Sequence, residues 1–155
     1  MNDLIVRKTV EINAPPAKVW DTLTNSEFTK QYMFGCELVS DLKVGSPILW
    51  RGASDAKIYV KGKIVSITPN KLLRFTTFDP NAVDKYEDIP SNYTTATYEL
   101  SPREEGTLLS VTQGDYSKIV NGSKRYQDTV TGWDFVLPKI KELAEKEFAS
   151  LSRNQ

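Results

Sequence analysis

The stretch VTGWDFVLPKIKELAE, residues 130 to 145, decides the fold that the sequence predicts. Apolar residues recur in it, and in the segment before it, at alternating steps of four and three, which keeps them on one face of an α-helix. Lysines and glutamates occupy the opposite face. The pattern predicts one amphipathic helix over about 118–149 that covers a sheet with its apolar face, made of Tyr126, Val130, Trp133, Leu137, Ile140 and Ala144.

Gly132 and Pro138 fall inside this predicted helix, where both are unfavourable. Glycine costs about 1 kcal/mol relative to alanine, and the proline removes a backbone hydrogen bond at a cost of about 3 kcal/mol. Burial of Trp133, Leu137 and Ile140 offsets this by roughly 1.5 to 3 kcal/mol each. We therefore expect a bent but continuous helix held by tertiary packing. Two separate helices that break near Gly132 are the alternative.

Strand patterns fill most of the remaining chain. Residues 4–12 alternate between apolar and polar side chains, which predicts a half-buried strand. Six segments between residues 35 and 115 are rich in β-branched and aromatic residues and are separated by Gly, Pro, Asn or Asp. Short connections at 68–71 and 101–106 favour hairpins, so we expect antiparallel strands in a meander. The six segments are CELVS, SPILW, KIYVKGKIVSI, KLLRFTTF, YTTATYEL and GTLLSVTQ.

Two short helices are predicted between the first and second strands. The sequence NAPPAKVWDTLTN places prolines where a first helical turn accepts them, followed by apolar residues at one-turn spacing. This pattern predicts a helix over about 15–24. Thr24 and Glu27 then fit a capping box for a second helix that reaches Tyr32. A polar turn at this position is the alternative.

Length and composition indicate a single domain over residues 1–155. The 20 Lys and Arg residues balance 20 Asp and Glu residues, which argues against binding of nucleic acid or an anionic membrane. No apolar run approaches the roughly 20 residues that span a bilayer. Cys36 is the single cysteine and the N-terminal residues lack a secretory pattern, so we expect a cytoplasmic protein. Residues 79–92 hold four carboxylates and two prolines, which predicts a flexible acidic loop.

The sequence contains no histidine. This excludes Ser/His and Cys/His nucleophile pairs and histidine-ligated zinc. The acidic residues Asp84, Glu87 and Asp88 match no calcium-loop spacing. We therefore expect no catalytic constellation, no metal and no cofactor. An arginine inside the fold would hold a carboxylate ligand, but the phase of Arg74 places it on an outer strand face.

The alternation along each strand predicts which side chains face the long helix. Most would form a close-packed core, but Tyr98 and Gln113 carry polar groups. These groups either pair with each other in a dry core or orient an apolar ligand in a pocket. Trp133 is the leading cavity-wall residue, because Gly132 beside it lets the helix approach a strand or leaves room beside the indole. The candidate ligand-binding residues are Trp50, Ile64, Phe75, Thr77, Tyr98, Val111, Gln113, Trp133, Val136, Leu137 and Ile140.

The order of these elements, with VEINAPPAKVWDTLTN at the front and GWDFVLPKIKELAE near the end, resembles the START-like, helix-grip superfamily (SRPBCC). Within it, the chain is similar to the family homologous to the C-terminal domain of the activator of the ninety-kilodalton heat-shock protein ATPase. The resemblance covers roughly residues 5–147. It implies an α+β fold in which a curved seven-stranded antiparallel sheet grips a long C-terminal helix. Pro138 departs from the family pattern, in which this helix usually continues.

The resemblance also implies a function. Members of the superfamily often accommodate a hydrophobic small molecule between sheet and helix, so binding of a lipid-like or aromatic ligand is the leading hypothesis. The alternatives are a co-chaperone-like module that binds a chaperone protein, and an enzyme related to the cyclases and hydrolases of the superfamily. Without histidine, such an enzyme would have to use Tyr59, Tyr98, Gln113 or a water molecule held by them. We therefore expect binding rather than catalysis.

Overall fold

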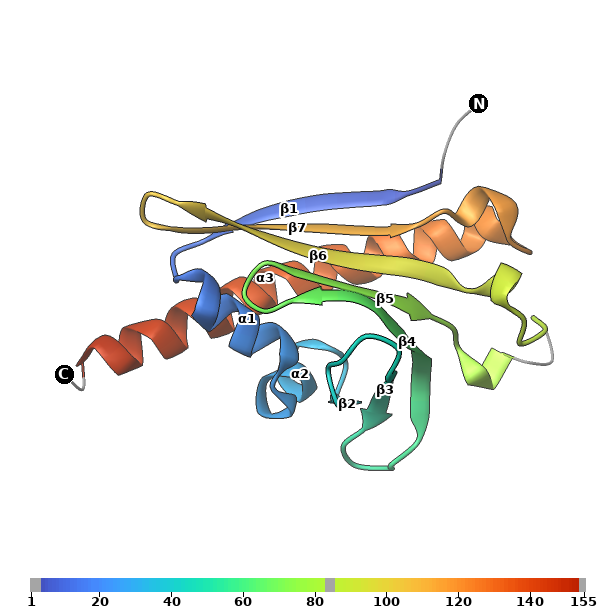
Figure 1. The fold of residues 1–155 in the computed structure, drawn as a ribbon, viewed down its shortest axis with the longest axis horizontal. Helices are drawn as coiled ribbons and strands as arrows, with labels where there is room; N and C mark the ends of the chain where they lie inside the picture. The colour runs from blue at the N-terminus through green and yellow to red at the C-terminus, as the bar shows by residue number, and fades with distance from the viewer. Residues whose placement is uncertain (1–3, 83–85, 154–155) are drawn as a thin grey trace.

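Seven strands, three α-helices and three short 3-10 turns make up the part of the chain that the computed structural model describes, residues 4–82 and 86–153 (Figure 1). The strand segments predicted from the sequence are all present. In chain order they are β1 (Val6–Ile12), β2 (Cys36–Ser40), β3 (Pro47–Gly52), β4 (Ile58–Thr68), β5 (Leu72–Thr77), β6 (Thr94–Arg103) and β7 (Gly106–Gly114).

The strands form one antiparallel sheet in the order β1-β7-β6-β5-β4-β3-β2. Strands β2 to β7 follow one another as the predicted meander, and β1 adds to the free side of β7, with Val6 opposite Gln113. The register shifts between Trp50 and Arg51 and again within β4. Such bulges bend a strand and increase its twist, which curves the sheet around the long C-terminal helix. The predicted seven-stranded, curved, antiparallel sheet is confirmed.

Helices α1 (Pro16–Thr24) and α2 (Ser26–Tyr32) form the predicted pair between β1 and β2. The predicted capping residue of α2 was wrong. Asn25 caps this helix, and its side-chain oxygen accepts a 3.0 Å hydrogen bond from the Glu27 N–H. Thr24 cannot serve because it is the last residue of α1 and its hydroxyl bonds back to a carbonyl of that helix.

Helix α3 (Gly122–Arg153) is continuous, so the alternative of two helices that break near Gly132 is wrong. It begins later than predicted because the turn η3 (Tyr116–Lys118) precedes it. Pro138 lies within α3 on its exposed face. Water can bind there to the carbonyl that the proline leaves without an amide partner, which reduces the cost of the missing hydrogen bond. Figure 1 shows α3 running along the sheet and extending past it at the C-terminal end.

The core lies between α3 and the face of the sheet that curves around it. The predicted phase of the strands is confirmed, because the apolar residues assigned to this face are at most 6% exposed. Thr77 and Gln113, on the same face, are half-buried. The buried apolar residues of the predicted face and of α3 are Ile48, Trp50, Ile64, Leu73, Phe75, Ala96, Tyr98, Leu100, Leu109, Val111, Trp133, Val136, Leu137 and Ile140.

The segment predicted to be an acidic loop contains the turns η1 (Pro80–Ala82) and η2 (Pro90–Asn92). Residues 83–85 lie outside the described part of the chain, and the flexibility of residues 79–92 stays a prediction. Asp88 in this segment accepts hydrogen bonds from Lys61 and from Tyr93. Over residues 4–82 and 86–153, no helix is both long and apolar enough to cross a membrane.

Candidate functional site

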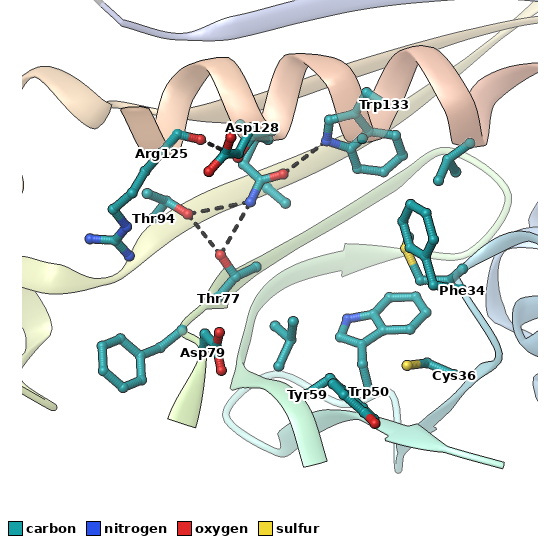
Figure 2. Close-up of a pocket in the computed structure, with 18 of the residues that line it drawn as sticks. Phe34, Cys36, Trp50, Tyr59, Thr77, Asp79, Thr94, Arg125, Asp128 and Trp133 are labelled. Carbon is teal, nitrogen blue, oxygen red and sulfur yellow. Dashed lines mark hydrogen bonds between the residues drawn. The ribbon is translucent and has the colours of Figure 1, made fainter. Parts of the chain in front are cut away.

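A pocket of about 770 Å³ lies between the N-terminal half of α3 and the inner face of the sheet. Its walls come from β2 to β7, from α3 between residues 124 and 136, and from adjoining connections such as the one between α2 and β2. Figure 2 shows Trp133 and Arg125 on α3 above Thr77 and Thr94, with Trp50 and Cys36 toward the other end. The pocket therefore occupies one end of the interface that the sequence predicted as core.

The space is left open because small side chains meet at this end. Ala96 and Thr94 on β6, Thr77 on β5, and Thr129 and Gly132 on α3 all line the pocket. Toward the other end of α3, leucine and isoleucine side chains fill the same interface completely, among them Leu100, Leu109, Leu137 and Ile140. A Cβ atom added at Gly132 would meet nothing within 4 Å. Gly132 therefore does not serve close approach to a strand, and room beside the Trp133 indole stays a prediction.

A continuous series of aromatic rings forms the apolar wall. The ring centroids of Trp50 and Phe75 lie 6.4 Å apart, those of Phe75 and Tyr98 lie 5.5 Å apart, and those of Tyr98 and Trp133 lie 5.8 Å apart. The last two pairs are edge-to-face, a favourable arrangement worth about 0.5 to 1.5 kcal/mol per pair. The series links β3 to α3 across the width of the pocket.

Gln113 on β7 joins this wall to a group of hydroxyls. Its side-chain oxygen accepts a 2.9 Å hydrogen bond from the Trp133 indole nitrogen. Its side-chain nitrogen lies 3.3 Å from the Thr77 hydroxyl and 3.4 Å from the Thr94 hydroxyl, which are themselves 2.7 Å apart. The suggested pairing of Gln113 with Tyr98 in a dry core is therefore wrong. Gln113 turns toward α3 and β5 instead, and its amide is fully engaged.

The Tyr98 hydroxyl has no hydrogen-bond partner among the described residues. In that part of the chain the only side-chain polar atom that is both fully buried and unpaired is Nη1 of Arg125. Tyr98 as a whole is only 1% exposed. Tyr98 lines the pocket, and burial raises the pKa of its phenol. The phenol of Tyr98 therefore stays neutral.

The structure brings seven of the predicted site residues to the pocket. These are Trp50, Phe75, Thr77, Tyr98, Gln113, Trp133 and Val136. The pocket lining does not include Ile64, Val111, Leu137 or Ile140, which are buried on the same faces but belong to the filled part of the core. Tyr59 also lines the pocket, and its side chain is partly exposed.

Several pocket residues were missed in the sequence. Arg125 and Thr129 on α3 line it, as do Tyr116 and Thr94. The Tyr116 and Thr129 hydroxyls lie 2.7 Å apart. Arg125, Thr129 and Gly132 share one helical face with Val136, at steps of four, three and four, so the spacing could have revealed them. The apolar stripe that was chosen starts at the neighbouring Tyr126, which is only half-buried.

Two exposed phenylalanines stack where the connection between α2 and β2 meets α3. The ring centroids of Phe34 and Phe135 lie 5.4 Å apart and the ring planes differ by 11°. Phe34 is 64% exposed and lines the pocket, and Phe135 is 51% exposed. The Lys139 ammonium lies 4.1 Å from the Phe135 ring centroid. The stack therefore connects the pocket edge to the outer surface of α3.

Among residues 4–82 and 86–153, no three or more His, Cys, Asp or Glu residues gather in a way that could hold a metal ion. Of the acidic residues considered for a cation, Asp84 lies outside the described residues. Cys36 lines the pocket as a buried free thiol, and burial raises its pKa.

Comparison with solved structures identifies proteins of similar fold. A protein from Cytophaga hutchinsonii with a solution structure is 32% identical, over 96% of this chain and 99% of that one, with a TM-score of 0.73. A crystal structure from Mesorhizobium loti matches at 20% identity over 92% and 97% of the two chains, with a TM-score of 0.71. The Aha1 dimer from Colwellia psychrerythraea matches at 19% identity over 91% and 96%, with a TM-score of 0.69. The last two likenesses concern the fold alone.

No curated protein matches this chain. The family model described as Activator of Hsp90 ATPase homolog 1-like protein matches residues 13–145, which include the helix pair, strands β2 to β7 and most of α3. The match agrees with the resemblance found in the sequence. The chain belongs to the family of Activator of Hsp90 ATPase homolog 1-like proteins.

Proposed function

We propose that this protein binds a hydrophobic small molecule, lipid-like or aromatic, in the pocket between the sheet and α3. The observation that carries the proposal is an open volume of about 770 Å³ bounded by a continuous series of aromatic rings. Pockets that take small ligands measure about 300 to 1,000 Å³. An apolar guest would remove ring surface from water, which contributes roughly 25 cal/mol per Å².

The polar groups that line the pocket differ in whether they can form a hydrogen bond with a ligand. Gln113 already bonds to Trp133 and faces two threonine hydroxyls, so it stabilises the pocket wall. The Tyr98 hydroxyl has no partner among the described residues and can donate to an oxygen of the guest. One free donor within an apolar wall is the arrangement that orients an apolar ligand.

A neutral fluorescent probe tests the proposal without knowledge of the natural ligand. N-phenyl-1-naphthylamine carries no charge and becomes more emissive in apolar surroundings. We expect saturable binding of one probe per chain, with quenching of tryptophan emission, because Trp50 and Trp133 line the pocket. The melting temperature should rise with probe concentration, since a ligand at about 100 times its Kd stabilises the folded state by about 2.7 kcal/mol. Non-saturable binding with an unchanged melting temperature would contradict the proposal.

A second candidate function is that of an Aha1-like module that binds a chaperone protein. The stacked and exposed rings of Phe34 and Phe135 favour it, because exposed aromatic pairs on a soluble domain often mark a protein contact. The test is the ATPase rate of a purified Hsp90-type chaperone with added wild-type protein or Phe135→Ser. Stimulation by the wild-type protein that Phe135→Ser reduces would support this candidate, and no stimulation by either would dismiss it.

A further inference from the structure

Arg125 enters the pocket from α3 at the end opposite Trp50 and Cys36 (Figure 2). Its Nη1 atom is buried, and no hydrogen-bond acceptor reaches it. It is the only side-chain nitrogen or oxygen among the described residues in that condition. Buried polar atoms are almost always paired in native proteins, so an unpaired charged donor at a pocket wall needs an explanation.

The rest of the guanidinium is held in place. Nη2 donates a 3.3 Å hydrogen bond to the carbonyl oxygen of Asn92. The guanidinium carbon lies 4.4 Å from the centroid of the Tyr86 ring, and the Tyr86 hydroxyl accepts a hydrogen bond from Asn121. A ring on one side and a carbonyl at one end fix the plane of the side chain. The plane of the guanidinium is therefore fixed at the pocket wall, and a small shift of the side chains that cover Nη1 would expose it to a ligand.

The nearby carboxylates do not neutralise Arg125. Asp128 lies 2.9 Å from the Lys124 ammonium, and Asp79 accepts a hydrogen bond from the Asn81 N–H. Among residues 4–82 and 86–153, no carboxylate forms an ion pair with Arg125. Within the described residues, the guanidinium therefore lies at the pocket wall without a paired carboxylate.

We propose that the ligand carries a single carboxylate, which Arg125 binds, and an apolar body that lies along the aromatic wall toward Trp133 and Trp50. This inference rests on the proposed function and specifies its ligand class. A guanidinium presents its N–H groups as a planar fork that matches the two oxygens of a carboxylate. The acceptor that Nη1 lacks would then come from the guest. The aromatic wall would receive the rest of the molecule.

The charges around Arg125 select a monoanion. Asp79, Asp128 and Lys124 line the same end of the pocket. Asp128 is paired with Lys124 at 2.9 Å, so Asp79 repels negative charge most strongly, and this repulsion grows with the charge of the ligand. A phosphate monoester carries nearly two negative charges at neutral pH. A carboxylate carries one and meets the fork of Arg125 with less repulsion. The ligand class is therefore a monocarboxylic acid with a long-chain or aromatic body.

A pair of matched probes tests the inference. Dodecanoate and dodecan-1-ol have the same chain and differ in the head group, so each can compete with N-phenyl-1-naphthylamine at pH 8, below the concentration at which micelles form. In the wild-type protein, we expect dodecanoate to bind at least about tenfold more tightly, a difference worth about 1.4 kcal/mol. Arg125→Gln should abolish the preference for dodecanoate over dodecan-1-ol, measured as the ratio of the two affinities in the same variant. Lys146→Gln is the control, because it removes an equal charge from an exposed part of α3 outside the pocket. This variant should keep the preference for dodecanoate.

The outcomes separate the two proposals. Equal affinity for the acid and the alcohol in the wild-type protein, with saturable probe binding, would overturn the carboxylate inference and leave the proposed function standing. A preference that persists in Arg125→Gln would also overturn it, because the acid would then bind elsewhere. If Arg125→Gln does not fold, Arg125→Lys replaces it, and this variant keeps the charge but lacks the fork. A preference as large as that of the wild type would then contradict the inference, and loss of most of it would support it.

Discussion

The indole nitrogen of Trp133 lies 2.9 Å from the side-chain oxygen of Gln113 and donates a hydrogen bond to it. This bond ties the middle of α3 to β7 at the boundary between the filled and hollow parts of the interface. The Trp133 indole also meets Tyr98 edge-to-face. The position of α3 above the pocket therefore depends on one polar and one aromatic contact of the same side chain.

Gln113→Leu should lower the free energy of unfolding by about 1 to 3 kcal/mol, because the buried Trp133 N–H loses its acceptor. Urea denaturation at neutral pH measures the change. The double variant Gln113→Leu with Trp133→Phe removes both partners and should be less destabilised than the sum of the two single variants. Strict additivity would show that the hydrogen bond contributes nothing.

Pro138→Ala should raise the free energy of unfolding by about 1 to 3 kcal/mol, because alanine restores the backbone hydrogen bond to Asp134 within α3. Denaturant unfolding gives the change directly. Pro16→Ala is the control, since Pro16 occupies the first turn of α1, where proline removes no helical bond. Destabilisation by Pro138→Ala would mean that the packing of α3 depends on the proline.

Phe34 combines a stacking contact with a strained backbone, since its φ is 52°. Phe34→Ala should lose the stack on Phe135, worth about 0.5 to 1.5 kcal/mol, and keep the strain. Phe34→Gly should lose the stack but relieve a left-handed conformation that costs a residue with a Cβ about 1 to 2 kcal/mol. Phe34→Gly is therefore expected to be the more stable variant in thermal unfolding. If Phe34→Gly were the less stable of the two, the strain would have to be absent in solution.

The titration of Asp115 should make the stability of the folded protein depend on pH. Its side-chain oxygen accepts hydrogen bonds from the N–H groups of Ser117, at 2.8 Å, and of Leu4, at 3.1 Å. The bonds from Ser117, and then that from Leu4, lower the pKa of Asp115 below its ordinary value. A lowered pKa in the folded state stabilises the protein above the unfolded pKa, near 3.9, and this contribution disappears as the pH falls through the folded pKa.

The melting temperature of the wild-type protein should thus exceed that of Asp115→Asn at pH 6, and the difference should shrink toward pH 3. Asp41→Asn, which removes an equal charge at an exposed position, is the matched control for the change in net charge. A difference for Asp115→Asn that does not change with pH would assign the effect to altered hydrogen-bond geometry rather than to titration.

The strands and the long helix could be predicted because their patterns are local. Alternation with a period of two assigned Phe75, Tyr98 and Val111 to the buried face, and the spacing of Leu137 and Ile140 assigned the buried face of α3. The cap at Asn25 was missed because the end of α1 had already taken Thr24. Adjacent helix ends compete for the same polar residues, and this competition is not visible in a single motif.

The position of the hollow could not be predicted, because it depends on residues from several elements. Ala96 and Thr129 carry no signal in their own segments, and a pocket forms only where such small side chains of the sheet and of α3 line the same space. The role of Arg125 could not be predicted either. Its unpaired Nη1, the ring of Tyr86 and the carbonyl of Asn92 come together only in the folded structure. Sequence spacing reveals a helical face but not what stands across from it.

The most direct test of the central claim uses Gly132, where an added Cβ atom would meet nothing within 4 Å. Gly132→Ala should raise the free energy of unfolding by about 1 kcal/mol through helix propensity and should keep binding of N-phenyl-1-naphthylamine. Gly132→Phe should fill the pocket with its own ring, fold with a melting temperature no lower than that of the wild type, and bind the probe at least about tenfold more weakly. Equal probe affinity in Gly132→Ala and Gly132→Phe would contradict the claim that this interior space holds an apolar guest.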